Sequence, residues 1–307
     1  MTAANPASMP VTSSALPGLP PLAERLGRAS LSRSRDLRDR GMRTLALAAA
    51  VLCLVPLAAV LVFVTLNGAS ALNLDLLTKP PKALGIGGGA VTAILGTLQL
   101  VPLAALIAMP VGILGAVYVG EFGDLRSART IRFAADVMSG VPSILIGIFV
   151  FTFLVLPFRQ FNAFAGSVAL AVIMIPVILR TTEETLRLVP GTLREASLAL
   201  GVPMWRTVLS VVLRTGLTGI LTGAMLAVAR AMGETAPLLF TALGSRLVNV
   251  GNLAQPMDSL PLFIYRNATQ ASVELNHQAW GAAFLLLVVV LVINVLVRFR
   301  TWGRQVG

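Results

Sequence analysis

Residues 192–241 read TLREASLALGVPMWRTVLSVVLRTGLTGILTGAMLAVARAMGETAPLLFT, and the two halves of this stretch differ in character. Its first half predicts a short polar-edged helix, a break at Gly201 and Pro203, and a second amphipathic helix. Its second half is apolar and carries Arg230 and Glu234, four residues apart. We expect the first half to be a docking surface for a cytoplasmic partner and the second to be a membrane helix that lines a polar path.

The composition is that of a membrane protein. Of the 307 residues, 56% are hydrophobic, whereas soluble domains are about 45–50% apolar. The mean hydropathy is +0.85. The net charge of +11 fits the basic cytoplasmic loops of membrane proteins, and no nucleic-acid-binding module accompanies it. We therefore expect the chain to contact a lipid bilayer and not a nucleic acid.

Six apolar runs are long enough to cross a bilayer. They are residues 44–66, 90–118, 134–156, 163–179, 219–243 and 279–297. The third run is interrupted by Gly140 and Pro142, which free backbone groups that neighbouring helices or a cavity must satisfy.

The expected domain organisation is one membrane domain with a tail at each end. Residues 1–43 are predicted to be a flexible basic tail, 44–297 the transmembrane domain and 298–307 a second basic tail. Within the membrane domain, 180–217 is the long cytoplasmic segment. This topology places eighteen of the 24 Lys and Arg residues on the cytoplasmic side, five outside and Arg230 within a span. The asymmetry predicts an all-α integral membrane protein with six transmembrane helices and both termini cytoplasmic.

The cytoplasmic segment contains signals for a short helix at 193–200. Thr192 and Glu195 have the spacing of a capping box, in which each side chain bonds the other residue's backbone amide. Gly201 suits the end of a helix, and Pro203 prevents its resumption. A helix of about two turns is unstable alone and needs tertiary support. These features also fit an ordinary loop between two helices.

The small side chains Ala196, Ser197 and Ala199 are expected on the outward face of this helix, where they would let another protein approach closely. The wider pattern, Glu195-Ala196-Ser197, then Gly201, then Val211-x-Leu213, resembles the EAA loop of ABC-importer permeases. In that family the loop is a coupling helix that sits in a groove of the ATPase subunit. The resemblance implies that Glu195, Ala196, Ser197 and Gly201 couple the chain to an ATPase. Two positions depart from the pattern: Ser197 replaces an alanine, and Arg214 replaces a proline.

Four further segments resemble the PstA-type permeases of phosphate-specific ABC importers. They are SGVPS at 139–143, RTTEE at 180–184, ARAMGETAPLLFT at 229–241 and SLPLFIYR at 259–266. The resemblance implies a type I ABC importer permease fold in the bacterial cytoplasmic membrane. It also implies three partners: a sister PstC-type permease in a heterodimer, a PstB-type ATPase dimer, and an external phosphate-binding protein.

The chain is expected to bind no cofactor itself. A phosphate-binding P-loop needs Gly-Lys-Ser/Thr, but Lys79 and Lys82 are the only lysines and are followed by Pro80 and Ala83. ATP and magnesium are therefore expected on the partner ATPase, and the chain is expected to be a non-catalytic subunit.

Arg230 lies about 11 residues, or roughly 16 Å, into its expected span, near the middle of the bilayer. An unpaired charge there costs about 2.5 kcal/mol or more, and Glu234 is placed to pair with it. The pair fits either a structural ion pair or an element of an anion pathway, since the planar guanidinium suits phosphate oxygens. The candidate pathway residues are Arg230, Glu234 and Thr235.

The predicted function is import of inorganic phosphate by alternating access, driven by a separate ATPase. A permease for sulfate or molybdate would use the same architecture. A secondary transporter or channel would leave the capped cytoplasmic helix unexplained. An intramembrane enzyme is disfavoured because Glu234 has no histidine or cysteine near it in sequence.

Overall fold

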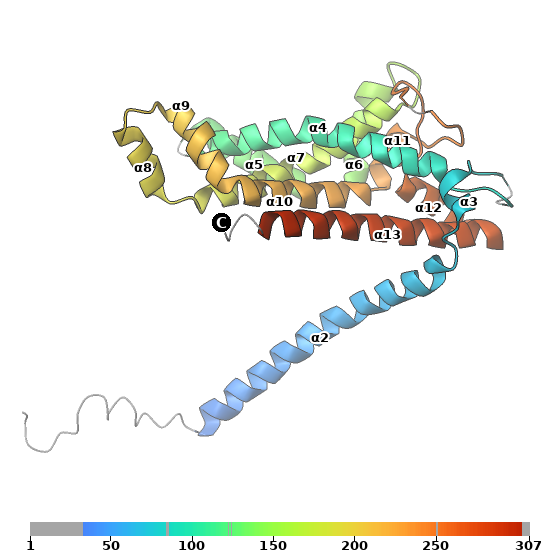
Figure 1. The fold of residues 1–307 in the computed structure, drawn as a ribbon, viewed down its shortest axis with the longest axis horizontal. Helices are drawn as coiled ribbons and strands as arrows, with labels where there is room; N and C mark the ends of the chain where they lie inside the picture. Colours follow the sequence, from blue (N-terminus) through green and yellow to red (C-terminus); the bar gives the residue numbers. More distant parts are fainter. Residues whose placement is uncertain (1–32, 84–85, 122, 124, 250, 303–307) are drawn as a thin grey trace, which may run out of the picture. The chain divides into compact units, whose positions relative to one another are not determined.

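The computed structural model describes residues 33–83, 86–121, 123, 125–249 and 251–302 (Figure 1). The described residues are nearly all helical, and Leu243 and Met257 form an isolated β-bridge among them. The helices are α2 (Arg33–Ala69), α3 (Leu74–Thr78), α4 (Val91–Glu121), α5 (Arg126–Gly140), α6 (Ser143–Val150), the π-helical η1 (Phe151–Val155), α7 (Ala163–Arg187), α8 (Gly191–Ala199), α9 (Met204–Thr207), the π-helical η2 (Val208–Val212), α10 (Leu213–Met232), α11 (Ala236–Thr241), α12 (Leu260–Ala268) and α13 (Val273–Trp302).

Within the described part of the chain, five helical segments are long and apolar enough to cross a membrane. They are Arg38–Ala69, Val91–Glu121, Ala163–Arg187, Met204–Met232 and Val273–Val297. A bent pair, Arg126–Gly140 and Ser143–Val155, raises the number to six if it counts as one span. The prediction of a helical membrane protein is confirmed.

The interruption expected in the third span, 134–156, is confirmed, because α5 ends at Gly140 and α6 begins at Ser143. The helix before the interruption begins at Arg126, ahead of the expected start of the span. The two parts of the pair are bent by 106°. Pro142 disfavours helical geometry in the residue before it, and Val141 is extended, with φ −71° and ψ 129°. The charged residues from Arg126 onward belong to the helix that precedes this bend.

The chain divides into two compact units, residues 1–60 and 61–307. In the first unit, the described residues continue as helix α2 from Arg33, so the helix includes part of the segment expected to be a flexible tail. Residues 1–32 and 303–307 of the expected tails lie outside the described residues.

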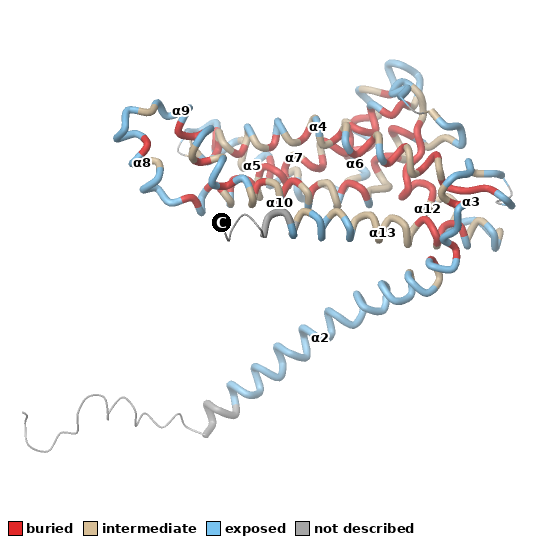
Figure 2. The backbone as a smooth tube through the Cα atoms, viewed as in Figure 1, coloured by how far each residue is buried: buried red, intermediate tan, exposed pale blue. Residues whose placement is uncertain are grey.

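In the second unit, α4, α7, α10 and α11 share the main hydrophobic core, which includes Leu100, Leu170, Ala227 and Leu238. Figure 2 shows buried residues along these helices. Close packing depends on glycine at Gly223, where a Cβ atom would lie 2.2 Å from Oγ1 of Thr181 on α7. Helices α8 and α9 lie at one end of this bundle, and α3 and α12 lie at the other (Figure 1).

Two expected spans have different ends in the structure. Helix α7 continues to Arg187, beyond the expected end at residue 179, which brings the RTTEE segment into the helix. The helix that carries Arg230 begins at Met204 and ends at Met232, whereas 219–243 was expected. It ends early because Gly233 closes it and the new helix α11 follows, with Pro237 in its first turn.

Candidate functional site

Helix α8 is the short helix that the sequence predicts at 193–200. It begins at Gly191, with Pro190 as its N-cap residue and no side-chain capping bond. The expected capping box between Thr192 and Glu195 is therefore absent. The capping box is absent because the helix begins one residue before Thr192. Thr192 therefore lies inside the first turn and not at the N-cap position.

The other end of α8 is formed as predicted by Gly201, which has a φ of +77°. The amide of Gly201 donates to the carbonyl of Leu198 at 2.9 Å, and the amide of Val202 donates to that of Ser197 at 3.2 Å. These two bonds form a Schellman motif, which favours glycine at the left-handed position. The turn leads directly into α9.

The four predicted coupling residues do not share one surface. Glu195, Ala196 and Gly201 are exposed. Ser197 is buried, and its Oγ lies 2.8 Å from Oγ1 of Thr207 on α9. The expected outward position of Ser197 is therefore wrong, and this residue acts on any partner only through the placement of α8.

Arg214, which departs from the EAA pattern, leaves the backbone helical. The chain passes from α9 through the π-helical turn Val208–Val212 into α10 without a break. The segment from Met204 to Met232 is thus one long helix, which begins next to α8 and ends next to Glu234.

Arg230 and Glu234 form the expected ion pair at the other end of this helix. Nε of Arg230 lies 3.8 Å from Oε1 of Glu234, and the side chains are 55% and 18% exposed. Arg230 occupies the last turn of α10, so its expected position in the middle of a continuous span is wrong. Thr235 is half-buried in the break between α10 and α11.

A cavity of about 20 Å³ lies beside Arg230. Its walls include Ser139 of α5, Ser143 of α6 and Val177 of α7. This volume holds about one water molecule. Nearby, Gly147 of α6 packs so closely on α11 that a Cβ atom would lie 2.6 Å from Cα of Pro237. In this conformation, α6 is therefore closed against α11 next to the charged pair.

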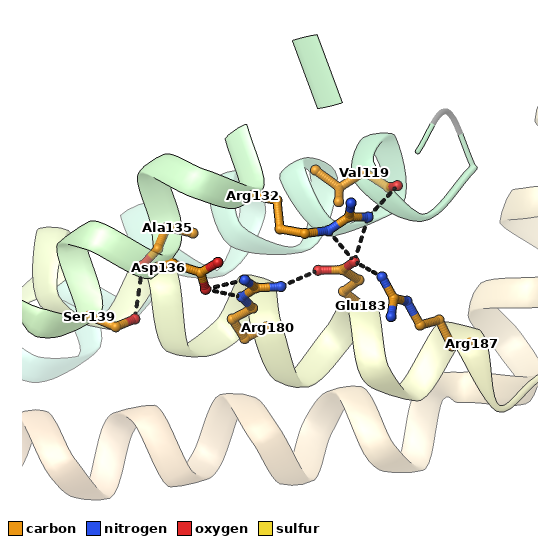
Figure 3. Close-up of polar contacts among 8 residues, drawn as sticks. All are labelled: Val119, Arg132, Ala135, Asp136, Ser139, Arg180, Glu183 and Arg187. Atoms are coloured by element: carbon orange, nitrogen blue, oxygen red, sulfur yellow. Dashed lines mark hydrogen bonds and ion pairs between the residues drawn. The ribbon is translucent and has the colours of Figure 1, made fainter. Parts of the chain in front are cut away.

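Glu183 is a polar centre that the sequence reasoning missed (Figure 3). Its side chain is 2% exposed, and its Oε1 accepts from Nε of Arg132 at 2.8 Å and from Nη2 of Arg187 at 2.6 Å. Its Oε2 accepts from Nη1 of Arg180 at 3.1 Å, and Arg180 also pairs with Asp136. Two residues of α5 are thereby tied to three of α7. The spacing of Arg180, Glu183 and Arg187 on one helical face was the available signal.

The sequence also matches a known family over residues 108–300. The description of that family is "Binding-protein-dependent transport system inner membrane component". The chain belongs to this family.

Several relatives named "Phosphate transport system permease protein PstA" also match most of the chain. The protein from Pasteurella multocida is 38% identical over 265 residues, which cover 86% of this chain and 94% of the relative. The protein from Haemophilus influenzae is 40% identical, covering 76% of this chain and 82% of the relative. The "PstA 1" protein of Mycobacterium tuberculosis strain CDC 1551 is 43% identical, covering 71% and 73%. These matches confirm the resemblance to PstA-type permeases.

Solved structures confirm the fold of this binding-protein-dependent permease. An inward-facing structure of the MetNI methionine ABC transporter has a TM-score of 0.53 and 21% identity, covering 70% of this chain and 94% of that chain. A bacterial ABC transporter involved in alginate import has a TM-score of 0.56 and 17% identity, covering 87% and 96%. At these identities the likeness establishes the type I importer permease fold.

Proposed function

We propose that the chain is the permease subunit of an ATP-driven importer that moves inorganic phosphate across the bacterial cytoplasmic membrane by alternating access. The observation that carries this proposal is the match to phosphate permeases over 71–86% of the chain. The segment with Arg230 and Glu234 supplies a chemistry that suits the anion.

Arg230, Glu234 and Thr235 are the proposed pathway residues. A guanidinium group bonds two phosphate oxygens at once, and more than half of the Arg230 side chain is exposed. Glu234 is a competing partner at 3.8 Å, so it limits how tightly Arg230 holds the anion. The 20 Å³ cavity beside Arg230 is too small for phosphate. Entry of the anion on this side of Arg230 then requires α5 and α6 to separate from α10 and α11, which is the movement that alternating access supplies.

The energy for this movement comes from a partner in the proposal. A PstB-type ATPase dimer binds ATP and magnesium and contacts the exposed residues Glu195, Ala196 and Gly201 of this chain. A sister PstC-type permease forms the other half of the pathway, and an external binding protein delivers phosphate. Both termini of this chain lie in the cytoplasm in this arrangement.

The test is uptake of labelled phosphate by cells that lack the chain, with and without a plasmid that restores it, in the presence of excess sulfate or molybdate. The proposal predicts restored uptake that neither anion competes and that stops when ATP is depleted. Competition by sulfate or molybdate would assign another oxyanion. Restored uptake that persists without ATP would indicate a secondary transporter or channel. No restoration, although the chain is inserted with its partners, would contradict the function.

A further inference from the structure

We propose that Arg194 is a positioning residue, which fastens the coupling helix α8 to the ends of α4 and α7 and so passes its movement to the membrane helices. This inference rests on the proposed function, because it takes α8 as the helix that contacts the ATPase.

The guanidinium of Arg194 makes three contacts outside α8. Its Nη2 donates to Oε1 of Glu121 at 3.2 Å and to the carbonyl of Leu186 at 3.1 Å. Its Nη1 donates to the carbonyl of Val189 at 3.0 Å. Glu121 is the last residue of α4, and its side chain is 5% exposed. Leu186 lies in the last turn of α7 and Val189 just beyond it. One side chain of α8 therefore reaches the ends of two long helices.

The site suits a cation for a second reason. The last carbonyl groups of a helix have no partner within that helix, and they form the negative end of the helix dipole. The Arg194 guanidinium meets the Leu186 carbonyl in the last turn of α7 together with the Glu121 carboxylate at the end of α4. The Leu186 carbonyl also accepts from the amide of Val189, at 3.3 Å. The side chain is 22% exposed, so these contacts are largely shielded from water.

Apolar packing does little to hold α8 in place. Ser197 is the only buried residue of this helix. Its leucines are largely exposed: Leu193 is 40% exposed and Leu198 is 44% exposed, and the C-cap residue Leu200 is 84% exposed. Polar contacts hold the helix instead. Arg194 bonds groups at the ends of α4 and α7, and Ser197 bonds Thr207 of α9, which continues into α10. A displacement of α8 reaches α4 and α7 through Arg194.

The experiment uses the full complex with the sister permease, the ATPase and the binding protein, reconstituted in lipid vesicles. Phosphate uptake and ATP hydrolysis are measured in the same vesicles, and the readout is phosphate transported per ATP hydrolysed. The variants are Arg194→Met, Arg194→Lys, Glu121→Gln and the double variant Glu121→Gln/Arg194→Met. Arg129→Met, at an exposed arginine on α5, is the matched control.

We expect Arg194→Met to lower phosphate per ATP by about tenfold, a typical size for coupling between sites. Arg194→Lys should recover part of the ratio, because a lysine keeps the charge but not the planar fork. The double variant should be no worse than Arg194→Met, since both changes remove one shared contact. Arg129→Met should match the wild type.

An unchanged ratio in Arg194→Met would overturn the proposal, as would a loss in which uptake and hydrolysis fall together. If Arg194→Met does not assemble, an unchanged ratio in both Arg194→Lys and Glu121→Gln would overturn it. Failure of the wild-type complex to transport phosphate would instead contradict the proposed function. The two failures are therefore distinguishable in one data set.

Discussion

The hydroxyl oxygens of Ser197 in α8 and Thr207 in α9 lie 2.8 Å apart, and the two residues are 8% and 0% exposed. A buried hydroxyl needs a hydrogen-bond partner, and each of these residues supplies one for the other. The serine that replaces an alanine of the EAA pattern thus has a structural reason in this chain. It fastens the short helix to the long helix that carries Arg230.

Ser197→Ala should lower the free energy of unfolding by about 1–2 kcal/mol, because it leaves the Thr207 hydroxyl buried without this partner. Ser197→Ala/Thr207→Val removes both hydroxyl groups and should recover most of the loss. Thermal unfolding of the purified chain in detergent measures both. A double variant that is less stable than the single variant would contradict the account.

Gly147→Ala should push α6 away from α11, because the added Cβ would lie 2.6 Å from the backbone of Pro237. Overpacking of this kind typically costs about 1–3 kcal/mol. Gly140→Ala is the matched control, since a Cβ atom at Gly140 meets nothing within 4 Å. The two variants should differ clearly in their free energy of unfolding and in their rate of phosphate uptake. Equal values for Gly147→Ala and Gly140→Ala would show that the α6–α11 contact is looser than described.

Glu183→Gln should destabilise the chain by about 2–3 kcal/mol. Removing one partner of a fully buried ion pair costs about 3–5 kcal/mol, and the arginines around Glu183 keep part of their surface exposed. Glu184→Gln, at the exposed neighbouring residue, should have little effect. Comparison of their unfolding curves in detergent tests this difference. Similar losses in both variants would contradict the assignment of Glu183 as the centre of the cluster.

Asp258 lies outside the membrane-spanning helices and pairs with Arg266. Burial raises the pKa of the Asp258 carboxyl, although the charge of Arg266 and the Ser259 amide oppose this. The folded chain therefore binds this proton more tightly than the unfolded chain does. The contribution of Asp258 to stability is fully present below its ordinary pKa of about 3.9 and is lost as the pH rises through its raised pKa.

Asp258→Asn should remove this contribution. We expect the stability of the wild type relative to Asp258→Asn to fall as the pH is raised from about 4 toward neutrality. Unfolding temperatures of both proteins in detergent, measured across this range, give the comparison. Parallel curves, or a wild type that gains relative stability with rising pH, would be inconsistent with the raised pKa.

Arg230→Ala should reduce phosphate uptake by about 10²-fold, because removal of one hydrogen-bond donor that is aimed at an oxyanion typically costs about 2.7–4 kcal/mol. Arg129→Ala, at an exposed arginine of α5, should transport normally. Uptake is compared at equal amounts of assembled complex. The pathway assignment fails if Arg230→Ala/Glu234→Ala keeps full uptake at full abundance in the membrane.

Local signals in the sequence predicted the helical membrane fold and several element ends. Gly201 ends α8 because only its left-handed geometry closes the Schellman motif. The break at Gly140 and Pro142 was also visible in sequence. The 106° bend was not, since its size depends on how α6 packs against α7 and α11.

Contacts between distant residues could not be predicted from spacing. Arg132 and Glu183 are 51 positions apart, and Glu121 and Arg194 are 73 apart. The expected end of α7 at residue 179 is too early because the polar residues that follow favour a loop, whereas ion pairs of Glu183 with Arg180 and Arg187 support the helix up to Arg187. Arg230 was correctly paired with Glu234, but its position at a helix end follows from Gly233 and Pro237.

The most direct test of the central claim is uptake of labelled phosphate into sealed vesicles that contain the reconstituted complex, with the binding protein outside and the ATPase side facing a lumen with or without ATP. The account predicts phosphate accumulation above the external concentration only when ATP is inside. Equal uptake with and without ATP, or ATP-dependent accumulation of another oxyanion in place of phosphate, would contradict it.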